Sequence, residues 1–255
     1  MKKILITGAR SGIMNQVIEK IKDYYFIYLT VHTDKQLERV KEKYKNNLNI
    51  KCFKLDVTNS KDRSKVEKLD IDILINNAAI GYGGSMIDID IDKVKENYEV
   101  NVFSNLSLTQ IVLKNMLKKG SGKIINMASL AGIVPISFIG SYSSTKASII
   151  KLTETLNKEL RMISNIKVSI IEPGFYNTGF NQVMFENKKI DFYFKKQLDI
   201  INKKQLFINK YIEKKNLDSI VNKIVCCIES NHPKFIYRAP FSQVMYAKIY
   251  NLFFE

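Results

Sequence analysis

Short apolar runs alternate with segments of helical spacing along this chain of 255 residues, and this alternation limits its possible folds more than any other feature. Strands that alternate with helices in this way form a parallel sheet with helices on both faces. The expected strands are Ile4–Thr7, Phe26–Val31, Ile50–Leu55, Ile71–Ile75, Lys123–Met127 and Val168–Ile171, with a short seventh at Lys234–Tyr237. The expected helices include Lys35–Tyr44, Ile91–Lys119, Ser141–Ile163 and Leu217–Ser230.

The length of the chain fits one domain. A chain of 29.5 kDa can bury one large core, and α/β domains of this size are commonly single. No internal repeat, low-complexity stretch or linker divides the sequence. We therefore predict one doubly wound α/β domain over residues 1–255.

A glycine turn follows the first expected strand. Residues 8–14 read GARSGIM, and helical spacing continues from there. A strand, a glycine turn and a helix N-terminus bring backbone N–H groups and the positive end of a helix dipole to a phosphate. Gly8 and Gly12 supply the backbone freedom and close approach that such a turn requires. Two glycines alone would be weak support for a phosphate site.

Ser129, Tyr142 and Lys146 form a second motif, which carries acid and base groups. On a helix, Tyr142 and Lys146 are four residues apart and share one face. A nearby ammonium group favours the phenolate and is expected to lower the pKa of the tyrosine from about 10 toward working pH. Ser129 ends an apolar strand, and its hydroxyl can donate a hydrogen bond to a substrate oxygen. The three side chains together suit proton transfer to a carbonyl or from an alcohol.

Further motifs occur in a fixed order after these. The segment 76–79 reads NNAA at the end of a strand, Asn101 lies early in a long amphipathic helix, and 173–178 reads PGFYNT. Together with the glycine turn and the Ser-Tyr-Lys set, they resemble the short-chain dehydrogenase/reductase family over residues 2–178. The resemblance implies a Rossmann-like domain, a nicotinamide dinucleotide cofactor, and an oxidoreductase that interconverts a ketone and a secondary alcohol.

The resemblance also implies a role for each catalytic residue. Tyr142 would be the acid in reduction and the base in oxidation, and Ser129 would orient the substrate oxygen. Lys146 would depress the pKa of the tyrosine and hold the nicotinamide ribose, while Asn101 would anchor a water that links Lys146 to solvent. The implied cofactor contacts are Gly8, Arg10, Ser11, Gly12, Ile13, His32, Asp56, Val57, Asn76, Ala78, Tyr142, Lys146, Pro173, Gly174 and Thr178.

Met14 departs from the family pattern, in which this position of the turn carries a third glycine. A methionine side chain there can crowd the helix and the backbone beside the pyrophosphate. One interpretation is that Met14 turns away on its flexible side chain, and we favour it because methionine adapts to irregular space. The alternative is a non-catalytic scaffold that has weakened or lost its cofactor. The complete set of Asn101, Ser129, Tyr142 and Lys146 favours an enzyme.

The choice of cofactor depends on the residues after the second strand. NAD-preferring members place an acidic side chain there, whereas residues 29–33 read LTVHT. Arg10 and His32 can approach a 2′-phosphate, although Ser11 occupies the position that is usually basic. We predict that NADP(H) is preferred over NAD(H).

Residues 179–216 are expected to form a lid over the substrate, because this segment covers the active site in the family. Its aromatic and aliphatic residues either line a pocket for a lipophilic substrate or only pack helices onto the sheet, and both interpretations stay open. They are Phe180, Met184, Phe185, Phe192, Tyr193, Phe194, Leu198, Ile201, Leu206, Phe207 and Tyr211. Further apolar lining is expected from Ala131, Ile133, Val134, Ile136 and Phe138. A lipophilic ketone or alcohol is the expected substrate.

The aromatic C-terminal stretch, residues 237–254, can close the pocket, bury a subunit contact or rest on a membrane surface. We favour packing or a subunit contact, since only a marked amphipathic face with basic flanks would support membrane binding. By resemblance, a homodimer or homotetramer is expected through the helices that carry Asn101 and Tyr142.

Charge and cysteine content exclude several other classes. The net charge is +15, but the lysines are scattered along the chain and no nucleic-acid reader motif is present, so no nucleic acid is expected as partner. Cys52, Cys226 and Cys227 have no metal spacing and are interpreted as reduced thiols, and His32 and His232 are far apart, so no metal is expected. No signal peptide or apolar run of membrane-spanning length is visible, so the expected location is cytoplasmic.

Overall fold

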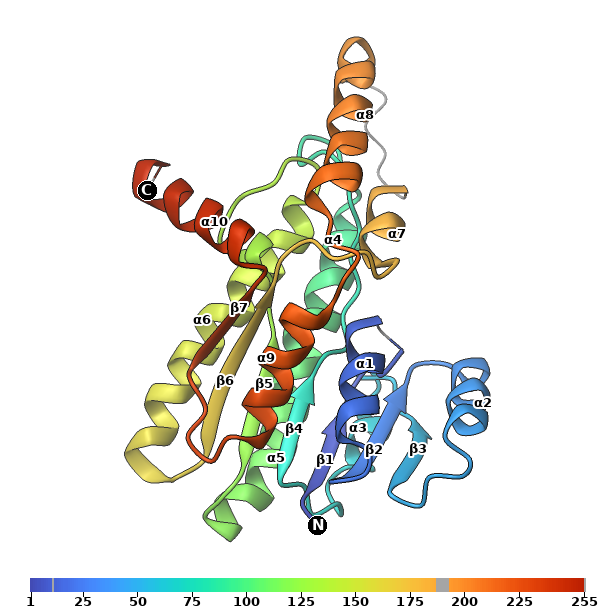
Figure 1. Ribbon diagram of the computed structural model, residues 1–255, viewed down its shortest axis with the longest axis vertical. Coiled ribbons are helices and arrows are strands. Elements are labelled where there is room, and N and C mark those ends of the chain that lie inside the picture. The colour runs from blue at the N-terminus through green and yellow to red at the C-terminus, as the bar shows by residue number, and fades with distance from the viewer. Residues whose placement is uncertain (11, 187–192, 255) are drawn as a thin grey trace.

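The strands of the described residues belong to one parallel sheet. The structure is a computed structural model that describes residues 1–10, 12–186 and 193–254. Figure 1 shows the sheet with helices packed on both faces, and its strands follow the order β3-β2-β1-β4-β5-β6-β7. The strands are β1 (Lys3–Ile6), β2 (Phe26–Val31), β3 (Ile50–Lys54), β4 (Ile73–Asn76), β5 (Lys123–Met127), β6 (Lys167–Pro173) and β7 (Ile236–Ala239). This topology confirms the predicted doubly wound α/β fold.

Helices connect the strands and complete the two outer layers. The α-helices are α1 (Gly12–Ile21), α2 (Asp34–Lys43), α3 (Ser60–Ser64), α4 (Ile91–Tyr98), α5 (Ser104–Lys119), α6 (Gly140–Ile163), α7 (Phe180–Glu186), α8 (Leu198–Phe207), α9 (Asp218–Glu229) and α10 (Phe241–Phe254). Shorter turns are η1 (Glu99–Phe103), η2 (Leu130–Gly132), η3 (Lys195–Gln197) and η4 (Ile208–Ile212).

The core lies on both sides of the sheet because side chains alternate along each strand. On one face, Ile4 and Ile6 of β1 pack with α1 and α9, and Val40 of α2 packs against the same cluster. On the other face, Leu5 packs with α5 and α6 through residues such as Leu108 and Leu160. Strands that are buried on both faces read as continuous apolar runs, which is why they were visible in the sequence.

The predicted elements agree with the structure except at some ends. The seventh strand lies at Ile236–Ala239 instead of Lys234–Tyr237, and β4 begins at Ile73 instead of Ile71. The helix predicted over Ile91–Lys119 consists of α4, η1 and α5, which follow one another without a gap. Its middle part, η1, is a π-helical turn. Four of the described α-helices were not predicted: the short α3, α7 and α8 within the predicted lid segment, and α10 at the C-terminus. Of these, α8 and α10 lie toward the upper end of the molecule in Figure 1.

Candidate active site

A cavity of about 1430 Å³ opens at the carboxyl ends of the strands. Its walls come from the glycine turn, the segments after β2, β3 and β4, the start of α6, and the segment from Pro173 to Met184. In a doubly wound sheet this edge is where ligands bind. The cavity brings together most of the predicted site residues: Gly8, Arg10, Ile13, His32, Asp56, Val57, Ala78, Ser129, Tyr142, Lys146, Pro173, Gly174 and Thr178.

The glycine turn lies against the end of β4. Gly8 has a φ of +62°, and a Cβ at this position would lie 2.8 Å from the Cα atom of Ala78, so a side chain cannot be placed here. Gly12 does not line the cavity, but a Cβ there would lie 3.4 Å from the Thr178 side chain, which marks a close approach of the two cavity walls. Ser11 lies outside the described residues.

Met14 points away from the cavity and into the core. Its side chain is fully buried in the cluster that α1 forms with β1, β2 and α9. The favoured interpretation of this residue, in which the side chain turns away, therefore agrees with its position. The observation that motivated a non-catalytic scaffold is thereby removed.

Asn77, and not the predicted Asn76, borders the cavity beside the glycine turn. The Asn77 side chain donates to the carbonyl oxygens of Thr7 and Gly8, at 3.0 and 2.8 Å. Asn76 points to the other side of the sheet, where it donates to the Thr109 hydroxyl at 2.7 Å. The strand pleat sends successive side chains to opposite faces, and the sequence alone did not show which amide faces the cleft. Thr7, which the sequence reasoning also missed, accepts hydrogen bonds from the backbone N–H groups of Asn77 and Ala78.

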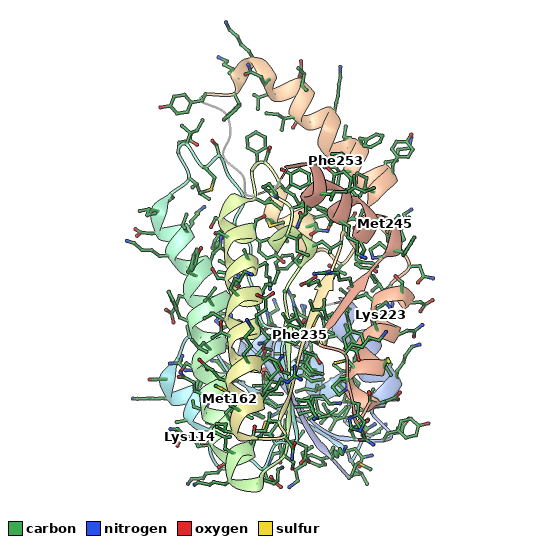
Figure 2. All side chains as sticks on the ribbon, turned by 90° about the vertical axis from the view of Figure 1, so that its left-hand side faces the viewer. Lys114, Met162, Lys223, Phe235, Met245 and Phe253 are labelled. Carbon is green, nitrogen blue, oxygen red and sulfur yellow. The ribbon has the colours of Figure 1, made fainter. Side chains whose placement is uncertain are left out.

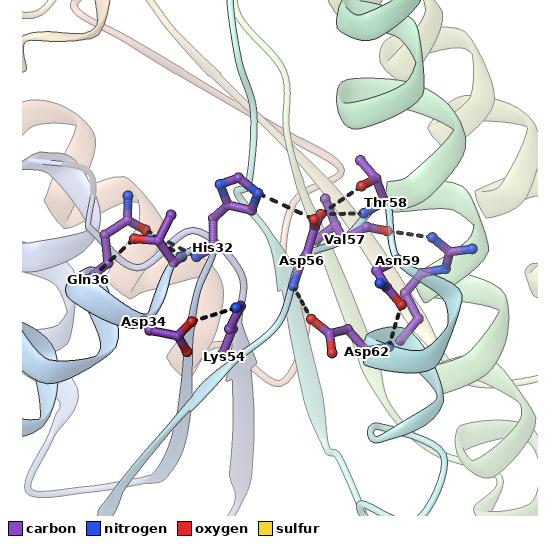
Figure 3. Close-up of polar contacts among 11 residues, drawn as sticks. His32, Asp34, Gln36, Lys54, Asp56, Val57, Thr58, Asn59 and Asp62 are labelled. Carbon is purple, nitrogen blue, oxygen red and sulfur yellow. Dashed lines mark hydrogen bonds and ion pairs between the residues drawn. The ribbon is translucent and has the colours of Figure 1, made fainter.

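His32 and Asp56 lie at the far end of the cavity, beyond the carboxyl ends of β2 and β3. Figure 3 shows the two side chains facing each other, with the His32 Nε2 atom 3.3 Å from a carboxylate oxygen of Asp56. The same carboxylate accepts hydrogen bonds from the backbone N–H and hydroxyl of Thr58, at 2.9 and 2.8 Å. Burial opposes ionisation of Asp56, but the Thr58 bonds and His32 outweigh it and lower the pKa of the carboxyl. A carboxylate acceptor and a mostly exposed imidazole therefore lie together here.

Ser129 and Tyr142 meet at the opposite end of the cavity. The Ser129 hydroxyl accepts from the backbone N–H of Ala131 at 3.1 Å and lies 3.3 Å from the carbonyl oxygen of Pro173, to which it donates. Burial raises the pKa of Tyr142 above its ordinary value, and a hydrogen bond with Ser129 offsets this rise in part. The expected lowering of the tyrosine pKa is therefore not found in the protein alone.

The position and the burial of Lys146 account for the absence of the expected lowering of the Tyr142 pKa. Its Nζ atom donates to the carbonyl oxygen of Met127 at 2.8 Å and lies 5.5 Å from the centroid of the Tyr142 ring. Burial lowers the pKa of Lys146 to about 7. Burial thus disfavours the charged ammonium form that would stabilise a phenolate. The motif is assembled as the sequence predicts, but the two pKa values are set mainly by burial.

Asn101 lies behind the site, within the π-helical turn η1, and does not line the cavity. Its amide donates to the carbonyl oxygen of Ile80 at 2.9 Å and to the Thr145 hydroxyl at 3.0 Å, and it accepts from the Ile80 backbone N–H at 2.9 Å. Asn101 thus fixes the chain after β4 against the helix that carries Tyr142. Single π-helical turns are frequent at functional sites.

The loop after β6 is held from behind by the C-terminal helix. The side-chain oxygen of Gln243 accepts from the backbone N–H of Phe175 at 2.7 Å, and its nitrogen donates to the carbonyl oxygen of Ile212 at 2.8 Å. A Cβ at Gly174 would collide with the Gln243 side chain. Gln243 therefore joins the cavity loop, η4 and α10. The sequence offered no signal for it, since the contact spans 68 residues.

Apolar side chains from the first part of the lid cover Tyr142. The Phe180 ring lies 5.4 Å from the Tyr142 ring, and the buried Met184 packs in the same cluster as Tyr142, Ala131 and Ile139. Of the other residues expected to line the pocket, Ile133, Val134, Ile136 and Phe138 do not border the cavity. The side chain of Phe185 and all of Phe192 lie outside the described residues.

Among the described residues 193–216 of the predicted lid segment, none borders the cavity. Among the predicted lid residues, Tyr193, Leu206, Phe207 and Tyr211 are exposed on the outside of the molecule, and Phe194 packs against Phe138. Within the described residues, no three side chains of His, Cys, Asp or Glu gather closely enough to bind a metal ion.

The arrangement combines a long cleft beside a glycine turn with a buried acid/base group at one end. The Ser129 hydroxyl and the Tyr142 phenol border the same space, so both can reach one oxygen atom of a bound molecule. An apolar cover over this end keeps water from the reacting atoms. Such a site suits proton transfer to a carbonyl oxygen.

Comparisons with known proteins agree with these features. A family model described as short chain dehydrogenase matches residues 2–189. The 3-ketodihydrosphingosine reductase of Bacteroides thetaiotaomicron is 30% identical, over 96% of this chain and 90% of that protein. The NADPH-dependent 3-dehydrocapnine reductase of Ornithobacterium rhinotracheale is also 30% identical, over 68% of this chain and 65% of that protein.

Solved structures share the fold. A short-chain dehydrogenase/reductase from Burkholderia phymatum in complex with NAD has a TM-score of 0.82 and 21% identity, over 98% of this chain and 93% of that one. A short chain dehydrogenase from Burkholderia cenocepacia in complex with NADP has a TM-score of 0.74 and 19% identity, over 98% and 94% of the two chains.

Proposed function

This chain belongs to the short-chain dehydrogenase/reductase family and is an NAD(P)-dependent oxidoreductase, and we propose that it reduces a lipophilic ketone with Tyr142 as the proton donor. The observation that carries the proposal is the position of Tyr142, which lies between the Ser129 hydroxyl and the apolar side chains of Phe180 and Met184. A proton donor beside a hydroxyl, under an apolar cover, suits a carbonyl on a hydrophobic molecule.

Each catalytic side chain has a distinct task in this proposal. Tyr142 has a raised pKa in the protein alone, so it is protonated at neutral pH and ready to donate to a carbonyl oxygen. Ser129 donates a hydrogen bond that orients and polarises the same oxygen. Lys146, with a pKa of about 7, can take up or release a proton close to Tyr142. Asn101 is a positioning residue that fixes Ile80 and the start of α6.

The cleft fits a nicotinamide dinucleotide. Gly8 leaves room only for backbone at the turn, and Asp56 offers an ionised acceptor at the far end of the cavity. When bound, the nicotinamide supplies the hydride for the reduction. Gly8 and Ile13 would border the pyrophosphate, Asp56 and Val57 the adenine, and Lys146 and Thr178 the nicotinamide half.

We expect NADP(H) to bind more tightly than NAD(H), because Arg10 and His32 line the cavity and residues 29–33, at the end of β2, contain no acidic side chain. Fluorescence titration with NADPH and NADH tests this expectation. His32→Asp should lower NADPH affinity by about tenfold and improve NADH affinity, since a carboxylate repels a 2′-phosphate and accepts from ribose hydroxyls. Equal affinities of the wild type for both cofactors would contradict the expected preference.

The proposed substrate class is a long-chain ketone with the carbonyl close to one polar end. Two 30% identical relatives carry names of reductases for lipid-like 3-keto compounds, and the cover over Tyr142 is apolar. NADPH oxidation should be measured with 3-ketodihydrosphingosine and with small sugar ketones. The wild type should favour the long-chain ketone in kcat/KM by at least about a hundredfold, because each buried methylene contributes about 0.8 kcal/mol. Turnover confined to the sugars would overturn the proposed substrate class.

Matched lid variants sharpen this test. Phe180→Ala should raise KM both for the long-chain ketone and for a water-soluble short-chain ketone, because Phe180 borders the cavity beside Tyr142. Leu206→Ala should leave KM for a water-soluble short-chain ketone unchanged, since Leu206 points outward from α8. Equal effects of the two substitutions on that KM would show that Phe180 has no special contact with substrate.

A further inference from the structure

Helix α10 carries an exposed apolar face. The side chains of Phe241, Leu252 and Phe253 are 79%, 78% and 73% exposed, and Met245 and Ile249 between them are also exposed. These positions are spaced four, four, three and one residues apart, which places them along one side of a helix. Figure 2 shows Met245 and Phe253 on this helix at the upper end of the molecule, far from Met162.

The opposite side of α10 packs on the protein. Val244, Ala247 and Tyr250 contact Leu130 and Val134 of the η2 region. The helix therefore has one apolar side that is covered by its own chain and another that is open. An exposed row of large apolar side chains marks an interaction surface.

Helix α8 and the turn η4 add a second exposed apolar group with basic neighbours. Leu206, Phe207 and Tyr211 are all more than half exposed. Six exposed lysines lie in or next to these elements: Lys195, Lys196, Lys203, Lys210, Lys214 and Lys215. Of the two acidic residues in this segment, Asp199 is exposed and Glu213 is buried. Aromatic residues mixed with lysines are typical of surfaces that contact lipid headgroups.

The two exposed groups are joined at one end of the molecule. The Gln243 side chain near the start of α10 donates to the Ile212 carbonyl oxygen at the end of η4, at 2.8 Å. Figures 1 and 2 both place α8 and α10 at the upper end, beyond the carboxyl ends of the strands. Val183, which is exposed, also lines the cavity.

We propose that α8, η4 and α10 form a docking surface for an anionic lipid bilayer. The docking surface comprises Leu206, Phe207, Tyr211, Phe241, Leu252 and Phe253 together with the six lysines. Charge decides between a bilayer and a second copy of the chain: two copies of this basic surface repel each other, whereas anionic lipid attracts each lysine. The net charge of +15 acts in the same direction.

The docking is peripheral. A helix of 14 residues is about 21 Å long, which is shorter than the ~30 Å hydrocarbon core of a bilayer. Across residues 1–10, 12–186 and 193–254, no helix is both long and apolar enough to cross a membrane. Helix α10 would instead lie in the interface with its apolar side in the lipid. Docking would let a lipid-like ketone pass from the bilayer to the cavity, and this step rests on the proposed function. The docking proposal itself does not depend on the proposed function.

Vesicle flotation of the full chain tests the docking surface. The wild type should float with phosphatidylcholine vesicles that contain phosphatidylglycerol, and binding should weaken without phosphatidylglycerol or in about 0.5 M salt. Phe241→Ser/Leu252→Ser/Phe253→Ser should reduce binding by at least roughly tenfold, since three inserted side chains are lost. The matched control Met162→Ser/Ile163→Ser changes two equally exposed apolar residues at the far end and should bind like the wild type.

Three outcomes would overturn the proposal. The first is a wild type that does not bind anionic vesicles, and the second is a far-end control that loses as much binding as the triple variant. The third is a triple variant that dissociates an oligomer in light scattering while its vesicle binding stays unchanged. The last result would assign the surface to self-association. NADPH binding and turnover are measured separately. A wild type that turns over substrate but does not bind anionic vesicles refutes docking alone, and a wild type that binds the vesicles but has no turnover refutes the proposed function alone.

Discussion

Met14 shows how one residue can change the meaning of a motif. In the turn sequence it stands where a glycine is usual, and a side chain in the cleft there would crowd the pyrophosphate. In the structure it is fully buried between α1 and the sheet, where it fills core volume. The neighbouring Ile13 lines the cavity instead.

Met14→Gly should therefore destabilise the protein without improving cofactor binding. Loss of a buried methionine side chain and a glycine within α1 together cost about 3–5 kcal/mol of unfolding free energy. Denaturant unfolding measures this cost, and fluorescence titration with NADPH measures affinity. A gain in NADPH affinity for the glycine variant would show that Met14 does crowd the cofactor.

Lys123 is a buried charge that links the sheet to α9. From β5, its Nζ atom donates to the carbonyl oxygens of Cys227, Ile228 and Ser230, at 2.7, 2.6 and 2.8 Å. Burial lowers its pKa to about 8 despite these bonds. Between about pH 8 and the ordinary lysine value of about 10.5, the unfolded chain binds more protons at this site than the folded one, so stability rises with pH.

Lys123→Met removes this dependence. The unfolding free energy of the wild type relative to Lys123→Met should increase by about 2–3 kcal/mol from pH 7 to pH 10.5, and the gain should be lost as the pH falls through about 8. Urea unfolding of both proteins at several pH values gives the difference. A difference that stays constant or falls with rising pH would show that Lys123 keeps its charge in the core.

At the scale of elements, α10 matters because Gln243 ties it to the cavity loop. Gln243→Leu would leave the Phe175 N–H without its acceptor, which costs about 1–3 kcal/mol. Gln243→Glu keeps that acceptor and loses only the donation to Ile212. We predict that the leucine variant loses more thermal stability and more NADPH affinity than the glutamate variant. Equal losses would mean that the Phe175 contact does not position the loop.

Elements with a strong local pattern could be predicted, and those set by tertiary contacts could not. The strands β1, β2 and β5 and the glycine turn were evident because buried parallel strands are continuous apolar runs. Helix α10 was not predicted, because it is apolar on two sides and lacks the polar face that identifies a helix in sequence. The lid was predicted as a segment, but which of its aromatic residues face the cavity depends on how α7 and α8 pack.

In the candidate site, too, features set by local sequence pattern could be predicted and features set by tertiary contacts could not. Tyr142 and Lys146 were predicted from their spacing on α6, and they do border the cavity together. The choice between Asn76 and Asn77 depends on the pleat of β4, and the pKa values of Tyr142 and Lys146 depend on burial that no local pattern reports. Gln243 contacts residues that are distant in the sequence, and no local pattern predicts these contacts.

At the scale of the whole molecule, the surface expected to form subunit contacts, on η1 and α6, is separate from the proposed docking surface on α8, η4 and α10. Phe103 at the end of η1 and Leu152 on α6 are 57% and 40% exposed, on the helices expected to form subunit contacts in this family. Light scattering should find a homo-oligomer, and Phe103→Glu/Leu152→Glu should shift it to smaller species. A monomeric wild type would contradict this expectation. Association through these helices would leave α8 and α10 open.

The central claim is that Tyr142 donates the proton in a reduction that uses NADPH. The most direct measurement compares wild type and Tyr142→Phe in two assays, NADPH titration and NADPH oxidation with a long-chain 3-keto substrate. The phenylalanine variant keeps the ring and loses only the hydroxyl. We predict unchanged NADPH affinity within about twofold and a loss of kcat of at least about a hundredfold. Retention of kcat by Tyr142→Phe would contradict the assignment of Tyr142 as the proton donor.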